Sequence, residues 1–275
     1  MSNNQGLIQQ ATKNNQSVQK SGKPSTLRDY IKQMEGEIAK ALPAVITPER
    51  FTRMVLTALS TDKKLELCTP QSFLGAMMTA AQLGLEPNTP LGQAYLIPYK
   101  NKGVLECQFQ IGYKGLIDLA YRSGEVEIIQ AQVAFENDEF DYELGLDPKL
   151  KHKPAKENRG KPIYYYAIFK TKSGGYGFEV MSFHDIKLHA KKYSQSYSSE
   201  YSPWQKNFDE MAKKTVLKRV LKYAPLKSDF VRAIAVDETV KKEISDDMYT
   251  VPAVELDETE YIITGEEIVV EEEQK

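Results

Sequence analysis

Apolar side chains in the first third of the chain recur every three or four residues, which is the period of an amphipathic helix. In residues 25–42 these positions are Leu27, Tyr30, Ile31, Met34 and Ile38. Two more helices are predicted to begin at Thr47-Pro48 and Thr69-Pro70, because threonine caps a helix and proline suits its first position. Gly84 is expected to end the third helix in a left-handed conformation. The pattern therefore predicts an N-terminal helical layer.

Further along, the apolar period shortens to two, as in strands with one buried face. Residues 94–99 and 104–111 are predicted to form a hairpin that buries Leu105, Cys107, Phe109 and Ile111 and turns Glu106, Gln108 and Gln110 to the other face. Strands are also expected at 126–134 and 140–144, and a second hairpin at 163–170 and 176–182. Residues 116–122 fit a short helix and 149–161 a basic loop. The sequence predicts an α+β fold, with a small antiparallel sheet and hairpins packed on helices.

The last third is predicted to be helical and then acidic. Helices are expected at 182–192, at 202–223 and at 228–243. Residues 1–24 have few apolar groups and are expected to be disordered. We therefore divide the chain into a disordered tail (1–24), a core (25–236) and an acidic C-terminal tail (237–275).

Charge is unevenly distributed between these parts. Residues 237–275 carry fourteen carboxylates and three lysines, a net −11, and the rest of the chain is therefore +9 although the total is only −2. A basic body favours a polyanionic partner, but a solvated surface with a solubilising tail explains the charge equally well. The two distant cysteines, the lack of a long apolar run and the polar N-terminus indicate a soluble protein of a reducing cytoplasm, with no membrane partner.

The helix predicted at 202–223 carries the clearest candidate for a phosphate-binding surface. Lys206, Lys214, Lys218 and Lys222 are spaced four or eight residues apart and are expected to share one exposed face, flanked by Lys213 and Arg219. Cations about 6 Å apart along a helix can follow a phosphate backbone. The alternative is an ordinary solvated face, although such faces usually mix charges of both signs.

Two weaker groups of residues also suit nucleic acid, because single strands are held by cations together with aromatic and amide groups. The first lies on and after the first hairpin and comprises Lys100, Lys102, Gln108, Gln110, Tyr113, Lys114 and Arg122. The second comprises Lys187, Lys191, Lys192 and Trp204, with Tyr193, Tyr197 and Tyr201 between them. A polar sheet face and a mobile linker are the competing interpretations.

Signals for an enzyme are poor. The chain has no phosphate-binding loop of the G-x-x-x-x-G-K-[ST] type, and its three histidines are scattered. The carboxylates of residues 136–143 could bind Mg²⁺ in a nuclease, although an acidic strand edge that discourages pairing is the commoner explanation. The alternatives kept open are a Mg²⁺-dependent nuclease and an adaptor whose acidic tail recruits an exonuclease.

Several segments, in order, resemble the RecT family of phage and prophage single-strand annealing recombinases. They are Leu83-Gly-Leu-Glu-Pro-Asn88, Leu91-Gly-Gln-Ala-Tyr-Leu-Ile-Pro-Tyr99, Gln108-Phe-Gln-Ile-Gly-Tyr-Lys-Gly-Leu116, Ala120-Tyr-Arg-Ser-Gly124, Ser202-Pro-Trp-Gln-Lys206 and Met211-Ala-Lys-Lys-Thr-Val-Leu-Lys-Arg-Val220. The resemblance implies a protein that is not an enzyme. It implies annealing of complementary DNA strands without ATP or another cofactor, with Mg²⁺ possible alongside DNA.

The resemblance also implies partners and an architecture, with DNA binding, annealing and oligomerisation in the core (25–236) and partner binding in the acidic C-terminal tail (237–275). Such proteins form rings or filaments on single-stranded DNA, hold the annealed duplex intermediate, and work with a 5′→3′ exonuclease and a host single-strand-binding protein. Their core is a small sheet with helices, distantly similar to that of the lambda beta protein. We expect the lysines of the 202–223 helix to hold phosphates, and the residues of the first hairpin to position a strand with its bases exposed.

Overall fold

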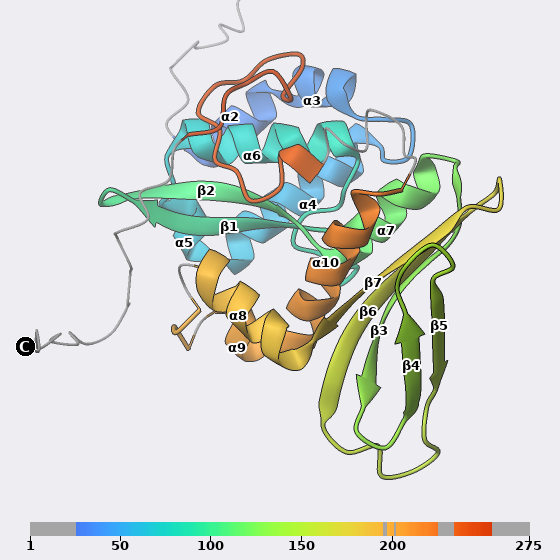
Figure 1. Cartoon of the computed structure of the whole chain (residues 1–275). Helices are drawn as coiled ribbons and strands as arrows, with labels where there is room; N and C mark the ends of the chain where they lie inside the picture. The colour runs from blue at the N-terminus through green and yellow to red at the C-terminus, as the bar shows by residue number, and fades with distance from the viewer. Residues whose placement is uncertain (1–25, 195–196, 201, 225–233, 255–275) are drawn as a thin grey trace, which may run out of the picture.

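A computed structural model describes residues 26–194, 197–200, 202–224 and 234–254, and there it confirms the α+β class (Figure 1). The N-terminal layer contains α2 (Leu27–Gln33), α3 (Glu35–Ala41), α4 (Pro48–Thr61), α5 (Lys63–Glu66) and α6 (Pro70–Leu83). The single helix expected over 25–42 is wrong. The chain leaves helical geometry at Met34 (φ −90°, ψ 3°), two residues before Gly36, and glycine is a poor helix former.

The predicted starts of α4 and α6 and the predicted C-terminal end of α6 are confirmed. Proline occupies the first turn of each helix, and Gly84 closes α6 with φ 58° and ψ 42°. A Cβ on Gly84 would lie 2.4 Å from the side chain of Pro43, so an L-residue there meets both backbone strain and a steric clash.

Gly84→Ala is expected to lower the free energy of unfolding by about 1–2 kcal/mol, because alanine disfavours the left-handed region. Urea denaturation measures the loss. Gly36→Ala is the control, since a Cβ at Gly36 meets no atom within 4 Å and its helix should become slightly more stable.

The predicted first hairpin is confirmed, and it packs against α6. Strands β1 (Ala94–Asn101) and β2 (Val104–Ile111) pair antiparallel, and α7 (Tyr113–Arg122) follows. One face of the hairpin packs on α6 and α5. Cys68 and Cys107 are free thiols buried in this region, and burial raises the pKa of Cys68 to about 12 and that of Cys107 well above its usual range.

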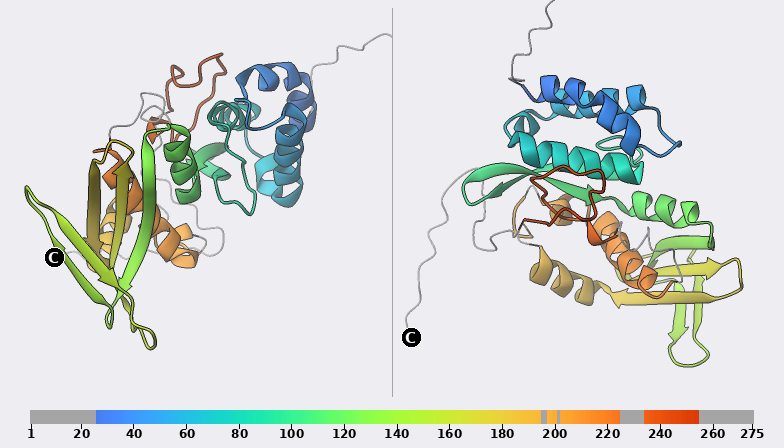
Figure 2. Two further views of the ribbon diagram at one scale, coloured as in Figure 1. Left: turned by 90° about the vertical axis from the view of Figure 1, so that its right-hand side faces the viewer. Right: turned by 90° about the horizontal axis from the view of Figure 1, so that it is seen from above.

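The second sheet has the strand order β3-β6-β7, formed by β3 (Val126–Phe135), β6 (Pro162–Thr171) and β7 (Tyr176–Ser182). Helix α10 (Phe208–Leu221) covers one face of this sheet and also contacts α7. Seen from above, the N-terminal helices, the first hairpin, α10 and this sheet follow one another in layers (Figure 2). Helix α8 (Phe183–Tyr193) lies beside β6 and β7.

The single helix expected over 202–223 is also wrong, because it is divided into α9 (Pro203–Lys206) and α10. Asn207 breaks it, with φ −137° and ψ 51°. Trp204 and Phe208 then contact each other across the break, with ring centroids 5.6 Å apart. Lys206 therefore does not continue the face of α10 that carries Lys214 and Lys218.

A two-stranded ribbon, β4 (Glu139–Glu143) paired with β5 (Lys149–Lys153), lies on the opposite face of the second sheet from α10. The basic loop expected over 149–161 is thus wrong in its first five residues, where Leu150 and His152 alternate with lysines. Phe140 stacks on Tyr164 of β6 at 5.3 Å. Asp138 holds the ribbon in place, since its buried carboxylate accepts hydrogen bonds from His152 of β5 and from Arg159.

The helix expected over 228–243 is not formed in its second half. Residues 225–233 lie outside the described residues, and from Val236 onward the chain is turn or extended. Val236, Val240, Met248 and Val251 are buried, and Thr239 pairs with Phe109 of β2. Residues 234–254 thus pack on the body, although their carboxylates were grouped with the acidic tail on charge alone. Among the described residues, no helix has the length and apolarity needed to cross a membrane.

Candidate nucleic-acid interface

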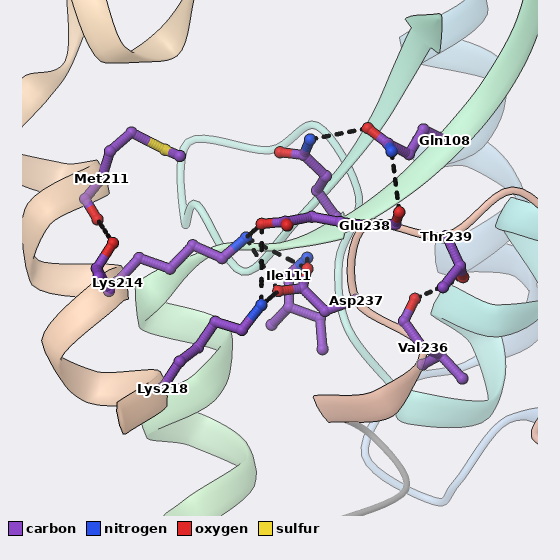
Figure 3. Close-up of polar contacts among 11 residues, drawn as sticks. Gln108, Ile111, Met211, Lys214, Lys218, Val236, Asp237, Glu238 and Thr239 are labelled. Carbon is purple, nitrogen blue, oxygen red and sulfur yellow. Dashed lines mark hydrogen bonds and ion pairs between the residues drawn. The ribbon is translucent and has the colours of Figure 1, made fainter. Parts of the chain in front are cut away.

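Two of the lysines singled out in the sequence, Lys214 and Lys218, meet two carboxylates from the segment Val236–Lys241, which we call the strap. Lys214 Nζ lies 3.1 Å from Asp237 Oδ2 and 3.0 Å from Glu238 Oε1. Lys218 Nζ lies 2.7 Å from Asp237 Oδ2. Figure 3 shows both lysines reaching from α10 toward the strap. The chain therefore returns to neutralise cations that are far away in the sequence.

The expectation that Lys214 lies on an exposed face is wrong. Its side chain is only 6% exposed. Burial alone would lower the pKa of Lys214, but the two strap carboxylates outweigh it and raise the pKa above its ordinary value. Burial likewise opposes ionisation of Asp237, and the two lysines overcome it and hold its pKa below the ordinary value. Both groups stay charged at neutral pH.

The strap is fastened to β2 by backbone and side-chain hydrogen bonds. Phe109 N donates to Thr239 O at 3.0 Å, Glu238 N donates to Phe109 O at 2.9 Å, and Ile111 N donates to Asp237 Oδ1 at 2.7 Å. Glu238 has φ 64°, a left-handed conformation that is uncommon for residues other than glycine and costs energy. The strap thus bridges β2 and α10 at the price of local backbone strain.

The two predicted amide contacts, Gln108 and Gln110, also lie at this junction. Gln108 Nε2 donates to Glu238 O at 2.9 Å (Figure 3). Gln110 Nε2 donates to Gln108 Oε1 at 2.9 Å. The strap covers Gln108, which is 8% exposed. The prediction that this sheet face is open is therefore wrong at Gln108, and the strap joins β2 and α10 at this point.

Aromatic side chains continue the site along the base of the hairpin. Tyr95 lies directly across from Gln110 in the strand register and is 39% exposed. Tyr113 lies under Lys213 Nζ, 5.9 Å from its ring centroid. Burial and then the Glu210 carboxylate raise the pKa of Tyr113. The sequence analysis did not name Tyr95 as a site residue, because only its pairing with Gln110 in the hairpin singles it out. Lys114, which the sequence analysis did name, is exposed.

Helix α8 presents the three lysines predicted for it, Lys187, Lys191 and Lys192, on its exposed surface. His189 of the same helix is close to α10. Its pKa is lowered by burial and then by Arg219, with Lys218 and Lys222 acting in the same direction and Glu238 opposing them. Tyr193 packs against His189 with the two rings tilted and their centroids 4.7 Å apart, and it is exposed. His189 of α8 is therefore close enough to the cations of α10 and to Glu238 of the strap for their charges to act on it.

Other predicted residues have different surroundings. Arg122 donates to Leu83 O at 2.8 Å and pairs with Asp118, so its guanidinium fastens α7 to the end of α6. Trp204 is buried against Phe208 and is not available for stacking on a base. Arg219 pairs with Glu179. Lys100 and Lys102 lie at the turn of the hairpin, at the opposite end from Gln110, while Lys206 and Lys222 are exposed at either end of α9 and α10.

Most of the carboxylates considered for a nuclease are engaged in other contacts. Glu139 pairs with Lys151 and Lys153, and Glu143 pairs with Lys149. Asp138 is surrounded by donors. Within the described ranges, no group of three or more His, Cys, Asp or Glu side chains is arranged to hold a metal ion. The acidic strand therefore serves ribbon pairing and gives the nuclease hypothesis no support.

Comparison with known proteins adds a direct relationship. Residues 49–251 match the RecT family. The chain is 41% identical to Protein RecT of Escherichia coli strain K12 over 223 residues, which are 78% of this chain and 81% of that protein. It is also 30% identical over 196 residues to the uncharacterized protein YqaK of Bacillus subtilis strain 168, covering 71% of this chain and 66% of that protein.

Proposed function

The chain belongs to the RecT family, and on this premise we propose that it binds single-stranded DNA and anneals complementary strands in recombination, without hydrolysing ATP. The observation that carries the proposal is the convergence of Lys214 and Lys218 of α10 with Gln108 and Gln110 of β2. These elements are about a hundred residues apart, and the strap joins them. Cations and amides gathered in this way suit a phosphate backbone.

In the proposed mechanism, cations of α8 and α10 reduce the repulsion between two phosphate backbones as they approach. Tyr95 and Tyr113 offer ring faces to bases, which stack without regard to sequence. Binding is accordingly expected to be of low sequence specificity, because phosphate contacts carry no sequence information directly. The bases stay available for pairing while the backbone is held.

The α8 lysines provide a clean test of the phosphate contacts. Lys191→Ala combined with Lys192→Ala is expected to weaken binding of an oligothymidylate roughly 5- to 10-fold near 0.1 M salt. It should also reduce the slope of log affinity against log salt by about 0.7 for each lost contact. Fluorescence anisotropy across a salt series measures both quantities.

The matched control is Lys32→Ala with Lys63→Ala, which removes the same charge from exposed positions of the N-terminal layer. It should leave affinity and slope within about a quarter of the wild-type values. Equal losses in both double variants would show that net charge, rather than the α8 surface, governs binding.

Annealing itself is tested with a labelled oligonucleotide, its complement added second, and Mg²⁺ present without ATP. Fast formation of intact duplex supports the proposal. Shortened products would instead support the nuclease alternative, and duplex formed no faster than without protein would overturn annealing.

We further propose that the protein acts as a homo-oligomer, as a ring or filament on DNA. The N-terminal helices are candidates for packing against the next subunit, but Leu27, Ile31 and Ile38 point into the subunit's own core. Deleting them would damage the fold, so only their outer faces are available to a neighbour. Light scattering of the full chain, alone and with an oligonucleotide, tests assembly, and a monomer in both conditions would refute it.

The strongly acidic segment after residue 254 is proposed to recruit a 5′→3′ exonuclease and a host single-strand-binding protein. A chain ending at Val254 keeps the strap and every described contact. It should anneal strands normally and lose co-purification of the partner. Unchanged co-purification would place the partner surface on the body instead.

A further inference from the structure

The strap occupies the proposed DNA-binding junction with negative charge of its own. Asp237 and Glu238 are adjacent in the chain, and both carboxylates contact Lys214. Four of the five cations from Lys213 to Lys222 pair with carboxylates: Lys213 with Glu210, Lys214 and Lys218 with Asp237 and Glu238, and Arg219 with Glu179. A nucleic acid approaching α10 gains little from these cations while the strap is in place.

The contacts of the strap are those that a DNA backbone would make. Carboxylates and phosphates are both anionic oxygen acceptors for lysine. Lys214 and Lys218 give the strap the charge-assisted bonds that they would give a phosphate. The amide of Gln108, the other group expected to touch DNA, donates to the Glu238 carbonyl. One short segment thus fills acceptor positions beside three of the predicted DNA contacts at once.

We propose that the strap is an intramolecular stand-in for the DNA backbone, and that a bound single strand displaces it and takes over Lys214, Lys218 and Gln108. This inference rests on the proposed function. Closure of the strap lowers the apparent affinity by the fraction of molecules in which the junction is open. The device makes binding selective for a polyanion long enough to replace several contacts together, because one isolated anion replaces only one.

Two features make Glu238 the place where displacement begins. Its side chain is 46% exposed, whereas that of Asp237 is fully buried. Its left-handed backbone stores strain that is released when the segment leaves β2. The Glu238 ion pairs with Lys214 and Lys218 are therefore accessible to a competing phosphate before the buried Asp237 contacts have to break.

Hydrogen exchange followed by mass spectrometry tests displacement directly. With a saturating oligothymidylate bound, peptides covering the strap and residues 105–111 of β2 should exchange at least about tenfold faster than in the free protein. The relevant amides are those of Glu238, Phe109 and Ile111, whose acceptors are lost when the strap leaves. Unchanged or slower exchange in the strap with DNA bound would overturn the inference.

Glu238→Gln provides an independent test, since it removes one strap charge and leaves the Asp237 bond to Ile111 intact. It is expected to tighten oligothymidylate binding about 3- to 10-fold, because the strap competes less well. Glu243→Gln is the matched control: it removes the same charge from an exposed carboxylate five residues along and should change affinity less than about twofold. Equal effects of the two substitutions would count against competition between the strap and DNA.

The results separate the two proposals. Failure of the wild-type chain to bind any single strand, with the fold intact by circular dichroism, removes the proposed function. Normal binding and annealing, with the strap still protected and Glu238→Gln indistinguishable from Glu243→Gln, leaves the function standing and removes only the displaceable strap.

Discussion

Lys214→Ala is expected to lower the free energy of unfolding by about 3–5 kcal/mol, because it leaves Asp237 buried with half of its compensating charge removed. Lys218 remains at 2.7 Å from Asp237, and Ile111 N still donates to it, which places the loss near the lower end of that range. For a folded body of about 200 residues, this corresponds to a decrease of roughly 6–12 °C in Tm. Calorimetry or thermal denaturation followed by circular dichroism measures it.

Lys213→Ala is the control, since Lys213 is the neighbouring residue on α10 and its 3.5 Å pair with Glu210 lies at the surface. Its loss should cost less than about 1 kcal/mol. Similar losses in the two variants would mean that the buried network contributes nothing special. Because the pKa of Lys214 is raised in the folded protein, its contribution to the free energy of unfolding depends on pH. The contribution is complete below the unfolded-state pKa near 10.5 and is lost as pH rises through the folded-state pKa.

This prediction changes how DNA-binding variants are to be designed. An alanine substitution at Lys214 or Asp237 alters the fold and the proposed interface together, and a loss of binding would not identify a phosphate contact. The exposed α8 lysines and Glu238 avoid this difficulty because their side chains reach solvent.

Asp138→Ala is the second substitution expected to have a large effect, with a loss of about 3–5 kcal/mol. The fully buried carboxylate accepts hydrogen bonds from five donors, all of which lose this acceptor in the variant. They are Phe135 N, Ala155 N, His152 Nε2, Arg159 Nε and Arg159 Nη2. The ribbon should come away from β6, and limited proteolysis should cut the segment 154–161 sooner than in the wild type.

Asp141→Ala, in the same strand but exposed opposite Lys151, should change stability by less than about 0.5 kcal/mol. Resistance of the Asp138→Ala ribbon to protease would show that aromatic packing alone holds it.

The stability that Asp138 contributes should decrease in acid. Arg159 first, and then His152 and two backbone amides, hold the pKa of Asp138 far below its usual range. A carboxylate with a lowered folded pKa contributes stability that is present above its unfolded pKa, near 3.9, and is lost as pH falls below that value. Unfolding by urea at pH 5 and pH 3 should therefore differ less in Asp138→Ala than in the wild type.

Local signals in the sequence predicted most of the elements. Pro48 and Pro70 fix the starts of α4 and α6, Gly84 fixes an end, and alternation in 104–111 identifies β2 and the face that packs on α6. Prediction from apolar periodicity fails where single residues interrupt or conceal the period. Asn207 interrupts a segment whose apolar period continues on both sides, and the lysines and the single proline of 149–161 conceal the alternation of Leu150 and His152 in β5.

The sequence allowed residues of the candidate site to be named, but not the way in which the strap covers them. Spacing identifies Lys214 and Lys218 as neighbours on a helix, and alternation places Gln108 with Gln110. No local pattern indicates that Asp237, 23 residues after Lys214, returns to cover it, because that contact depends on how the chain crosses from α10 to β2. Burial of a lysine is also an event that sequence reasoning discounts, since unpaired lysine is almost never buried.

The two thiols described beside the first hairpin have a practical value. The thiolate is the reactive form of cysteine, and burial keeps Cys68 and Cys107 protonated and inaccessible at neutral pH. Maleimide dyes should therefore spare both of them in the native protein. One cysteine engineered on the outer surface of α8 can then carry a fluorophore in an otherwise unaltered chain, and energy transfer to a labelled oligonucleotide would follow each strand as it arrives.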